Sequence, residues 1–398
     1  MAGAAEPPAT ATTPATAPAT APGAVSSPAI AQIVDRVSKS RIEATIKSLP
    51  TARAPGPDAA HIAGLLETQR LLAKQLSDLG YTPFTQVVPY GKRPPRVDPA
   101  DPEQPKAIAP KPEWLNIWVD IPGTTAPNEV LIIGAHFDAV PHSPGADDNG
   151  SGVAVLIELA HALKDVKPAR TVRLMLYNLE EGGLFGSIYY VSTWKEGGKA
   201  RGESIIGMLS LDSIGYFSDE PKSQQNPFKG INGMPNLEVG DFLSLCGSSV
   251  YRGFVARLAS SMSAGDERCK TLRVDIFPNT IFPIMPPDLL RSDHQPFVAM
   301  GVPAVMVTDT ANFRNPHYHK PTDTIDTLNF ERLHHAARAI VGAAAIISGV
   351  DAQLMPATAE LTTKHPPVEL PTKKSLAPSA TPAESAQPND KPADPAAK

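Results

Sequence analysis

The sequence predicts an α/β fold, a three-layer α/β/α sandwich with a mostly parallel central sheet. Short runs rich in apolar residues alternate along the chain with segments whose apolar residues recur at helical spacing. Such alternation is typical of a parallel sheet covered by helices on both faces. Polar residues also follow several of the apolar runs directly, as they do where a sheet of this kind holds a ligand at the carboxyl ends of its strands.

The two ends of the chain differ in composition from the rest. Residues 1–28 are almost entirely Ala, Pro, Thr and Gly, and residues 356–398 are rich in Pro, Ala, Lys, Thr and Ser. Neither end has enough apolar residues to offset the entropy lost on ordering, so both are predicted to be disordered tails. The length of the body between them, residues 29–355, favours one elaborated domain over two.

Three helices are expected at the start of this body. Apolar residues at helical spacing predict short helices at 30–37 and 42–49 and a longer helix at 62–79, which Gly80 ends. A proline-rich loop follows at 90–113.

Strands and helices alternate after that loop. The predicted strands are 116–121, 129–138, 171–180, 205–212 and 303–310, and the predicted helices are 150–163, 186–195 and 330–347. Residues 217–290, rich in Pro, Gly and Ser, are expected to form a lid or a pocket wall.

Charge and hydropathy argue against two classes of partner. The net charge is -5 and the sequence has no basic stripe, which argues against nucleic-acid binding. No apolar run approaches the roughly 20 residues that a membrane span needs. Cys246 and Cys269 are too few for a disulfide framework or a thiolate metal site, and whether they pair is left open.

Histidines and carboxylates follow the predicted strands. The segment GAHFDAVPHSPGADDNGSG connects the strand at 129–138 to the next helix; Glu180 and Glu181 end the following strand, Asp212 ends the one after it, and His319 follows the last. Because the carboxyl ends of parallel strands meet at one edge of a sheet, these side chains are expected to converge there.

Crowded carboxylates repel one another and need a cation. A set of His, Asp and Glu without thiolate suits zinc, or less commonly cobalt or manganese. Two metals that share one carboxylate need about five protein ligands, and the chain supplies that number.

The motifs HFD, PGADDNGSG, NLEEGGLFGS, LSLD, SDHQPF and HYHKPTDTID occur in this order between about residues 115 and 330. In that order they resemble the motifs of the co-catalytic zinc aminopeptidases of peptidase family M28, so residues 29–355 are expected to form an M28-type peptidase domain. The resemblance implies two zinc ions per chain and peptides as substrates.

The resemblance also implies a role for each site residue. His136 and Asp212 would hold one zinc, Glu181 and His319 the other, and Asp147 would bridge them. Glu180 would act as the general base on the bridging water. Asp138 would orient His136 through the distal ring nitrogen.

Two features leave alternatives open around this site. His317 competes with His319 as a ligand, and the spacing from His319 to Asp323 favours His319. Some relatives carry a tyrosine a few residues before SDH that helps to hold the oxyanion, whereas this chain has PPDLLRSDH. Arg291, Tyr318 or the second zinc would have to substitute, and Arg291 and Tyr318 are therefore candidate substrate-binding residues.

The leading functional prediction is hydrolysis of the N-terminal residue of peptides. The alternatives are a glutaminyl-peptide cyclotransferase on the same fold, which uses one zinc and no water nucleophile, and a non-catalytic binding relic. A carboxypeptidase relative would normally bring extra domains. We expect a periplasmic or extracellular location, although the printed N-terminus lacks the basic and apolar segments of a signal peptide.

Overall fold

The computed structural model describes residues 27–90, 112–227, 237–276 and 287–366. Its helices are α1 (Pro28–Val34), α2 (Lys39–Ser48), α3 (Ala59–Asp78), α4 (Gly152–Ala162), α5 (Phe185–Ala200), α6 (Arg252–Gly265), α7 (Gln295–Ala299), α8 (Phe330–Ser348) and α9 (Thr358–Thr362). Its strands are β1 (Phe84–Val87), β2 (Leu115–Ile121), β3 (Ala126–His136), β4 (Arg170–Tyr177), β5 (Ser204–Leu211), β6 (Leu243–Ser248), β7 (Thr271–Ile276) and β8 (Ala304–Thr308).

The strands form one sheet in the order β1-β2-β4-β3-β5-β8-β6-β7. The central strands β4, β3, β5 and β8 run parallel to one another. Antiparallel pairing occurs toward the two sides, between β1 and β2, between β2 and β4, and between β8 and β6, while β7 is parallel to β6. The predicted mostly parallel sheet is confirmed, and its parallel centre is where several strands end at the same edge.

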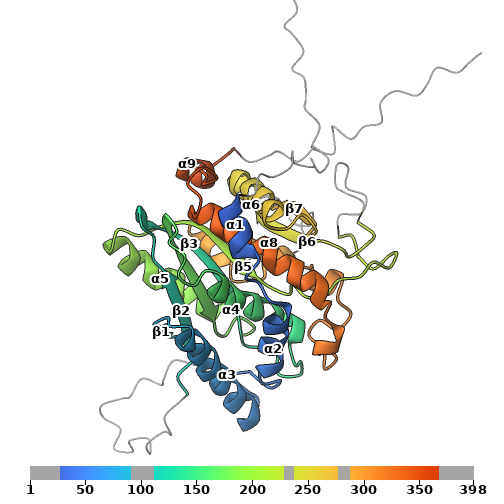
Figure 1. Cartoon of the computed structure of the whole chain (residues 1–398). Helices are drawn as coiled ribbons and strands as arrows, with labels where there is room; N and C mark the ends of the chain where they lie inside the picture. The colour runs from blue at the N-terminus through green and yellow to red at the C-terminus, as the bar shows by residue number, and fades with distance from the viewer. Residues whose placement is uncertain (1–26, 91–111, 228–236, 277–286, 367–398) are drawn as a thin grey trace, which may run out of the picture.

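Strand β3 shows why the fold has three layers. Its alternate residues Leu131, Ile133 and Ala135 pack into the larger core, with side chains of α4, α6 and α8. Val130 and Ile132 point to the opposite face and pack with side chains of α5 and α7. Because successive side chains of a strand point to opposite faces, a strand that is apolar at every position needs helices on both sides. Figure 1 shows these helices around the sheet.

Residues 217–290 were predicted to form a lid or a pocket wall. They also contain two strands of the sheet, β6 and β7, and the helix α6. The sequence of β6, LSLCGS, is short and rich in small residues, so it gives a weak strand signal. Those small residues allow close packing. A Cβ atom on Gly247 would lie 2.7 Å from Cγ2 of Val255 and 3.0 Å from Cγ2 of Val305.

The predicted C-terminal tail is corrected for residues 356–366. The guanidinium of Arg170 is buried and donates hydrogen bonds to the carbonyl of Pro356 (2.8 Å) and to Oγ1 of Thr358 (3.0 Å). Leu361 in α9 is fully buried. A buried cation needs acceptors, and this segment supplies them. Residues 1–26, 367–398 and most of the predicted proline-rich loop lie outside the described residues.

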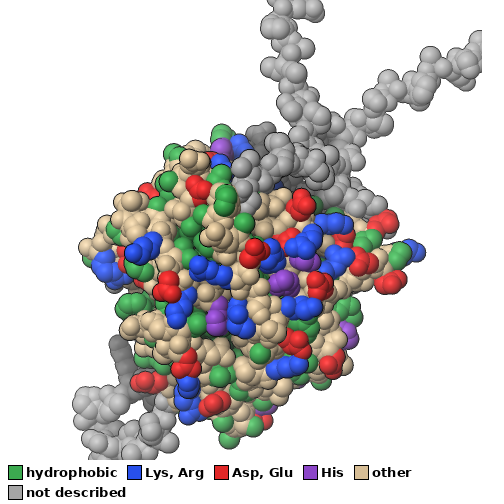
Figure 2. Space-filling view, viewed as in Figure 1, with side chains coloured by type: hydrophobic (Ala, Val, Ile, Leu, Met, Phe, Trp, Pro, Cys, Tyr) green, Lys and Arg blue, Asp and Glu red, His purple; other side chains and the backbone are tan. Residues whose placement is uncertain are grey.

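Within the described residues, no helix combines the length and the apolar character needed to cross a membrane. Figure 2 shows basic and acidic side chains interspersed over the visible face, without a large area of one sign.

Candidate metal centre

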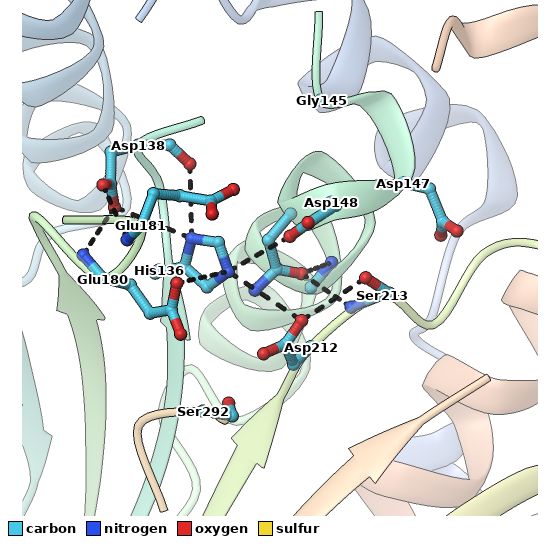
Figure 3. Close-up of polar contacts among 12 residues, drawn as sticks. His136, Asp138, Gly145, Asp147, Asp148, Glu180, Glu181, Asp212, Ser213 and Ser292 are labelled. Carbon is cyan, nitrogen blue, oxygen red and sulfur yellow. Dashed lines mark hydrogen bonds and ion pairs between the residues drawn. The ribbon is translucent and has the colours of Figure 1, made fainter. Parts of the chain in front are cut away.

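The candidate site lies beyond the carboxyl ends of the parallel strands (Figure 3). His136 is the last residue of β3, and Asp212 follows directly after β5. Strand β4 ends at Tyr177, three residues earlier than predicted, so Glu180 and Glu181 lie in the connection to α5. The sheet therefore brings side chains from three neighbouring connections to one edge, as the sequence predicted.

Two groups of side chains there have the composition and spacing of metal ligands. His136, Glu180 and Asp212 form one group, and Asp148, Glu181 and His319 form the other, with all ligand atoms of a group within 4.8 Å of one another. In the first group, Nε2 of His136 lies 3.9 Å from Glu180 Oε2 and 3.8 Å from Asp212 Oδ1. In the second, Nε2 of His319 lies 3.2 Å from Glu181 Oε2.

Asp148 connects the two groups. Its Oδ1 lies 3.3 Å from Nε2 of His136, and its Oδ2 lies 2.9 Å from Nε2 of His319. One carboxylate thus faces a histidine of each group, which is the arrangement that a pair of metals with a shared ligand requires.

The prediction that Asp147 occupies this position is corrected. Asp147 Oδ1 accepts a hydrogen bond from the Gly215 amide (2.8 Å), and Oδ2 accepts one from Asn315 Nδ2 (2.7 Å). Figure 3 shows its carboxylate well apart from His136. The backbone of the segment Ala146–Ser151 leaves helical dihedral angles at Asp148 (φ -103°, ψ 92°), so the two neighbouring side chains turn to different sides.

Non-glycine residues with left-handed backbone adjoin both groups. Leu179 (φ 61°) precedes Glu180, Ser213 (φ 51°) follows Asp212, and His319 itself has φ 55°. This conformation is uncommon for residues with a side chain, and it is often found at functional sites. It allows sharp changes of chain direction at the points where ligands are presented.

Two further carboxylates, Asp138 and Asp323, accept hydrogen bonds from the main-chain amides of the two acidic pairs, Glu180–Glu181 and Asp147–Asp148. We call them the clamp carboxylates. Oδ1 and Oδ2 of Asp138 accept hydrogen bonds from the amides of Glu180 (3.0 Å) and Glu181 (3.2 Å). Oδ1 and Oδ2 of Asp323 accept them from the amides of Asp147 (2.9 Å) and Asp148 (3.2 Å).

Asp138 was also predicted to orient His136. The nearer contact of His136 Nδ1 is to the main-chain carbonyl of Asp138, at 3.2 Å, and its carboxylate Oδ1 lies at 3.6 Å. Both atoms lie on the Nδ1 side of the ring, so Nε2 remains directed at the other members of the site.

Arg53, which the sequence did not single out, supports the connection that carries Asp148. It is 2% exposed and donates to the carbonyls of Phe137 (2.9 Å), Gly145 (2.5 Å) and Pro144. Gly145 has φ 63°, and a Cβ there would lie 2.7 Å from Nη2 of Arg53. The side chain comes from the segment between α2 and α3, where the sequence RAPG carries no recognisable motif.

The electrostatics of the site indicate that a cation belongs there. Burial, followed by repulsion from Asp148, raises the pKa of Glu181 to about 7, and burial raises the pKa of Glu180 well above its usual range. Glu181 Oε1 is buried without a hydrogen-bond partner among the described residues. A divalent cation would remove the repulsion and satisfy this oxygen. The donor set, imidazole and carboxylate without thiolate, fits zinc.

A pocket adjoins Asp212 on the β8 side of the site. Part of its lining is apolar and consists of Cys246, Leu272, Val274 and Met306, which come from β6, β7 and β8. The structure also places the two predicted substrate-binding residues here, Arg291 and Tyr318. Arg291 pairs with Asp288 at 2.7 Å, and the ring of Tyr318 stacks on His319 with centroids 3.9 Å apart.

The competing histidine lies elsewhere. His317 is half-buried, its Nδ1 contacts Thr322 Oγ1 at 3.0 Å, and it belongs to neither group. The two cysteines are both free and buried, and they pack in different apolar clusters.

Two named relatives each match more than half of this chain. Uncharacterized protein YfbL of Escherichia coli (strain K12) is 32% identical over 240 residues, which cover 57% of this chain and 69% of YfbL. Leucine aminopeptidase 1 of Arthroderma otae is 30% identical over 242 residues, which cover 57% of this chain and 56% of that protein. The chain thus spans little more than half the length of the second relative.

Solved structures with low sequence identity share the fold. The LapA aminopeptidase of Legionella pneumophila superposes with a TM-score of 0.57 at 17% identity, covering 80% of this chain and 74% of LapA. The glutaminyl cyclase of Fimbriiglobus ruber gives 0.54 at 18% identity, covering 77% of this chain and 94% of the cyclase.

The family model of Peptidase family M28 matches residues 116–344 of the 398 in the chain. This match includes both groups of candidate ligands and the clamp carboxylates. The chain belongs to peptidase family M28.

Proposed function

We propose that the chain is a zinc-dependent aminopeptidase that hydrolyses the N-terminal residue of peptides. The observation that carries the proposal is the position of Asp148 between two groups of metal-ligand side chains, beside an apolar pocket. Family membership and relatives named as aminopeptidases support it.

Two zinc ions would divide the site between them. His136 and Asp212 would hold one ion, Glu181 and His319 the other, and Asp148 would contribute one oxygen to each. Each ion then has three protein ligands, the number typical of catalytic zinc. Zinc in such a pair supplies a Lewis acid that lowers the pKa of bound water to about 7 and polarises a carbonyl.

Glu180 would act as general base. With three ligands available for each ion, its carboxylate is not required as a fourth, although it lies beside His136 and Asp212. It would accept a proton from the attacking water and donate it to the leaving amine. The hydrogen bond from the Glu180 amide to Asp138 fixes the main chain at this position.

The pocket would receive the side chain of the N-terminal residue. The apolar part of its lining, Cys246, Leu272, Val274 and Met306, favours an apolar side chain, because burial of apolar surface against these residues is favourable. Arg291 and Tyr318 would contact the substrate at the edge of the pocket, where Tyr318 stacks on His319.

The test is metal analysis of the full chain together with hydrolysis of a panel of aminoacyl amides. We expect close to two zinc ions per chain, loss of activity on chelation, recovery with zinc or cobalt, and preference for leucine amide over aspartate amide. Full activity after exhaustive chelation, with no metal detected, would contradict the proposal.

A glutaminyl-peptide cyclotransferase is the second candidate, because the fold is shared with the cyclase of Fimbriiglobus ruber. It would bind one zinc and would convert an N-terminal glutaminyl peptide to a pyroglutamyl peptide with release of ammonia. The aminopeptidase would instead release free glutamine. Metal stoichiometry and mass analysis of the product separate the two. Location outside the cytoplasm and lack of nucleic-acid binding stay as predictions from the sequence.

A further inference from the structure

Large hydrophobic side chains that are exposed concentrate in one area of the described chain. They are Phe84, Val87, Tyr90, Phe185, Ile188 and Leu290. All except Leu290 belong to β1, to the residues just after it, or to the first turn of α5. An exposed apolar cluster next to a catalytic site is often a binding surface.

Three of these side chains lie near the connection that carries Glu180 and Glu181, and we call Tyr90, Phe185 and Ile188 the apolar rim. The rings of Tyr90 and Phe185 meet edge to face, with centroids 5.4 Å apart. Ile188 lies one helical turn beyond Phe185, on the same side of α5. Their exposed fractions are 39%, 38% and 49%.

The rim lies beside Gly182, the residue that follows the candidate ligand Glu181. A Cβ atom on Gly182 would lie 3.4 Å from Cε2 of Tyr90 and 3.6 Å from Cδ2 of Phe185. Residues 182 and 183 are both glycines, so the two residues that follow Glu181 add no side chain beside the rings.

The order of the sheet places the rim and the pocket on opposite sides of the metal centre. The apolar lining of the pocket comes from β8, β6 and β7, the metal ligands other than His319 lie at or just after the ends of β4, β3 and β5, and the rim lies beyond β4 toward β1. If the N-terminal side chain occupies the pocket and Glu180 protonates the leaving amine, the second residue of the peptide lies on the Glu180 side. The rim is the apolar surface on that side.

We propose that the apolar rim binds the side chain of the second residue of the substrate, and that the enzyme prefers peptides with an aromatic or large aliphatic residue there. The inference rests on the proposed aminopeptidase function. An aromatic side chain stacked on such a rim gains about 0.5–1.5 kcal/mol beyond its burial, which corresponds to roughly 2- to 10-fold in kcat/KM.

The test compares release of leucine from Leu-Phe-amide and Leu-Gly-amide by the zinc-loaded full chain. We expect wild-type kcat/KM to be about 5- to 10-fold higher for Leu-Phe-amide, mainly through KM. Phe185→Ser and Tyr90→Ser should each bring the ratio close to one, with zinc content unchanged.

Val87→Ser is the matched control. Val87 is 48% exposed on β1, but its side chain points to the opposite face of the strand from Gln86, whose amide bonds Thr193 of α5. This variant should keep the wild-type ratio.

Three results would overturn the inference. The first is a wild-type ratio near one, and the second is an equal loss of kcat/KM for both peptides in the rim variants. The third is a change from dimer to monomer in Phe185→Ser by sedimentation, because the rim would then cover a second copy of the chain. Failure of the proposed function itself gives a different result, since wild-type protein would then not hydrolyse leucine amide either.

Discussion

Two connections in this molecule each carry a pair of adjacent acids, and they use the pair differently. In the connection after β3 the pair is Asp147–Asp148, and in the connection after β4 it is Glu180–Glu181. In both, one distant carboxylate accepts hydrogen bonds from the two successive amides: Asp323 for the aspartates and Asp138 for the glutamates. The support of the main chain is therefore the same in both.

The side chains differ in where they point. Glu180 and Glu181 both face the site, one in each group of ligands. Asp148 faces both histidines, whereas Asp147 turns away and binds the Gly215 amide and Asn315, next to the segments that carry Asp212 and His319. An acidic pair at a strand end thus supplies either two groups to the chemistry, or one to the chemistry and one to the alignment of neighbouring loops.

The largest expected effect separates Asp148 from Asp147. Asp148→Asn leaves each group of ligands one charged oxygen short, so both zinc ions should bind poorly and activity should fall by more than about 10³-fold, since zinc contributes several kcal/mol to the transition state. Asp147→Asn should retain zinc and lower the free energy of unfolding by about 1–3 kcal/mol, because its amide group would face the Gly215 or Asn315 donor. Metal content and urea unfolding of both variants check this. If Asp147→Asn loses zinc and Asp148→Asn keeps it, the comparison is reversed.

Within the glutamate pair, Glu180→Gln should give the next largest effect. The change keeps the shape and removes the base, so kcat should fall by about 10²- to 10⁴-fold while both zinc ions remain. Steady-state kinetics on leucine amide with parallel metal analysis measure it. Loss of zinc in this variant would show that Glu180 is a ligand, as its position beside His136 and Asp212 also permits.

Glu181→Gln should be milder and should respond to metal. A neutral amide oxygen is a weaker ligand than a carboxylate, so one zinc should bind poorly and activity should partly return with excess zinc. Titration of the metal-free variant with zinc, followed by calorimetry and by activity, tests this. A variant that binds two ions with wild-type affinity would remove Glu181 from the ligand set.

The sequence was sufficient to predict the edge of the sheet at which the site lies. Runs such as VLII in β3 are apolar at every position, so the strands and the residues that follow them could be located. Strand β6 could not be located in this way, because its sequence is short and contains small and polar residues. Its place in the sheet depends on packing with distant residues, such as that of Val255 and Val305 against Gly247.

The same limit applies within the site. Spacing cannot distinguish Asp147 from Asp148, since the choice depends on the dihedral angles at Asp148 and on donors from Gly215 and Asn315, far along the chain. Arg53 and Tyr90 lie in segments without a motif, and their relation to the site appears only in three dimensions. Contacts between distant segments decided what the sequence left open.

The smallest expected effects concern the clamp carboxylates Asp138 and Asp323. They test whether the two carboxylates contribute equally to zinc binding. Asp138→Asn and Asp323→Asn each replace one accepting oxygen by a donor that faces a main-chain N–H, so the acidic pair should be held less firmly. Loss of such an outer partner typically lowers metal affinity by about 10- to 100-fold. Asp138→Asn should lie at the upper end of that range, because Asp138 also lies on the Nδ1 side of His136, whereas the hydrogen bonds that Asp323 accepts come from the main-chain amides of Asp147 and Asp148. Zinc dissociation constants, measured by competition with a chelator, test this prediction. Asp326 is an exposed aspartate three residues from Asp323, and Asp326→Asn is the matched control. It should bind zinc as wild type does. If Asp138→Asn and Asp323→Asn weaken zinc binding no more than the control, the amide hydrogen bonds do not position the ligands and the parallel between the two connections is one of geometry alone.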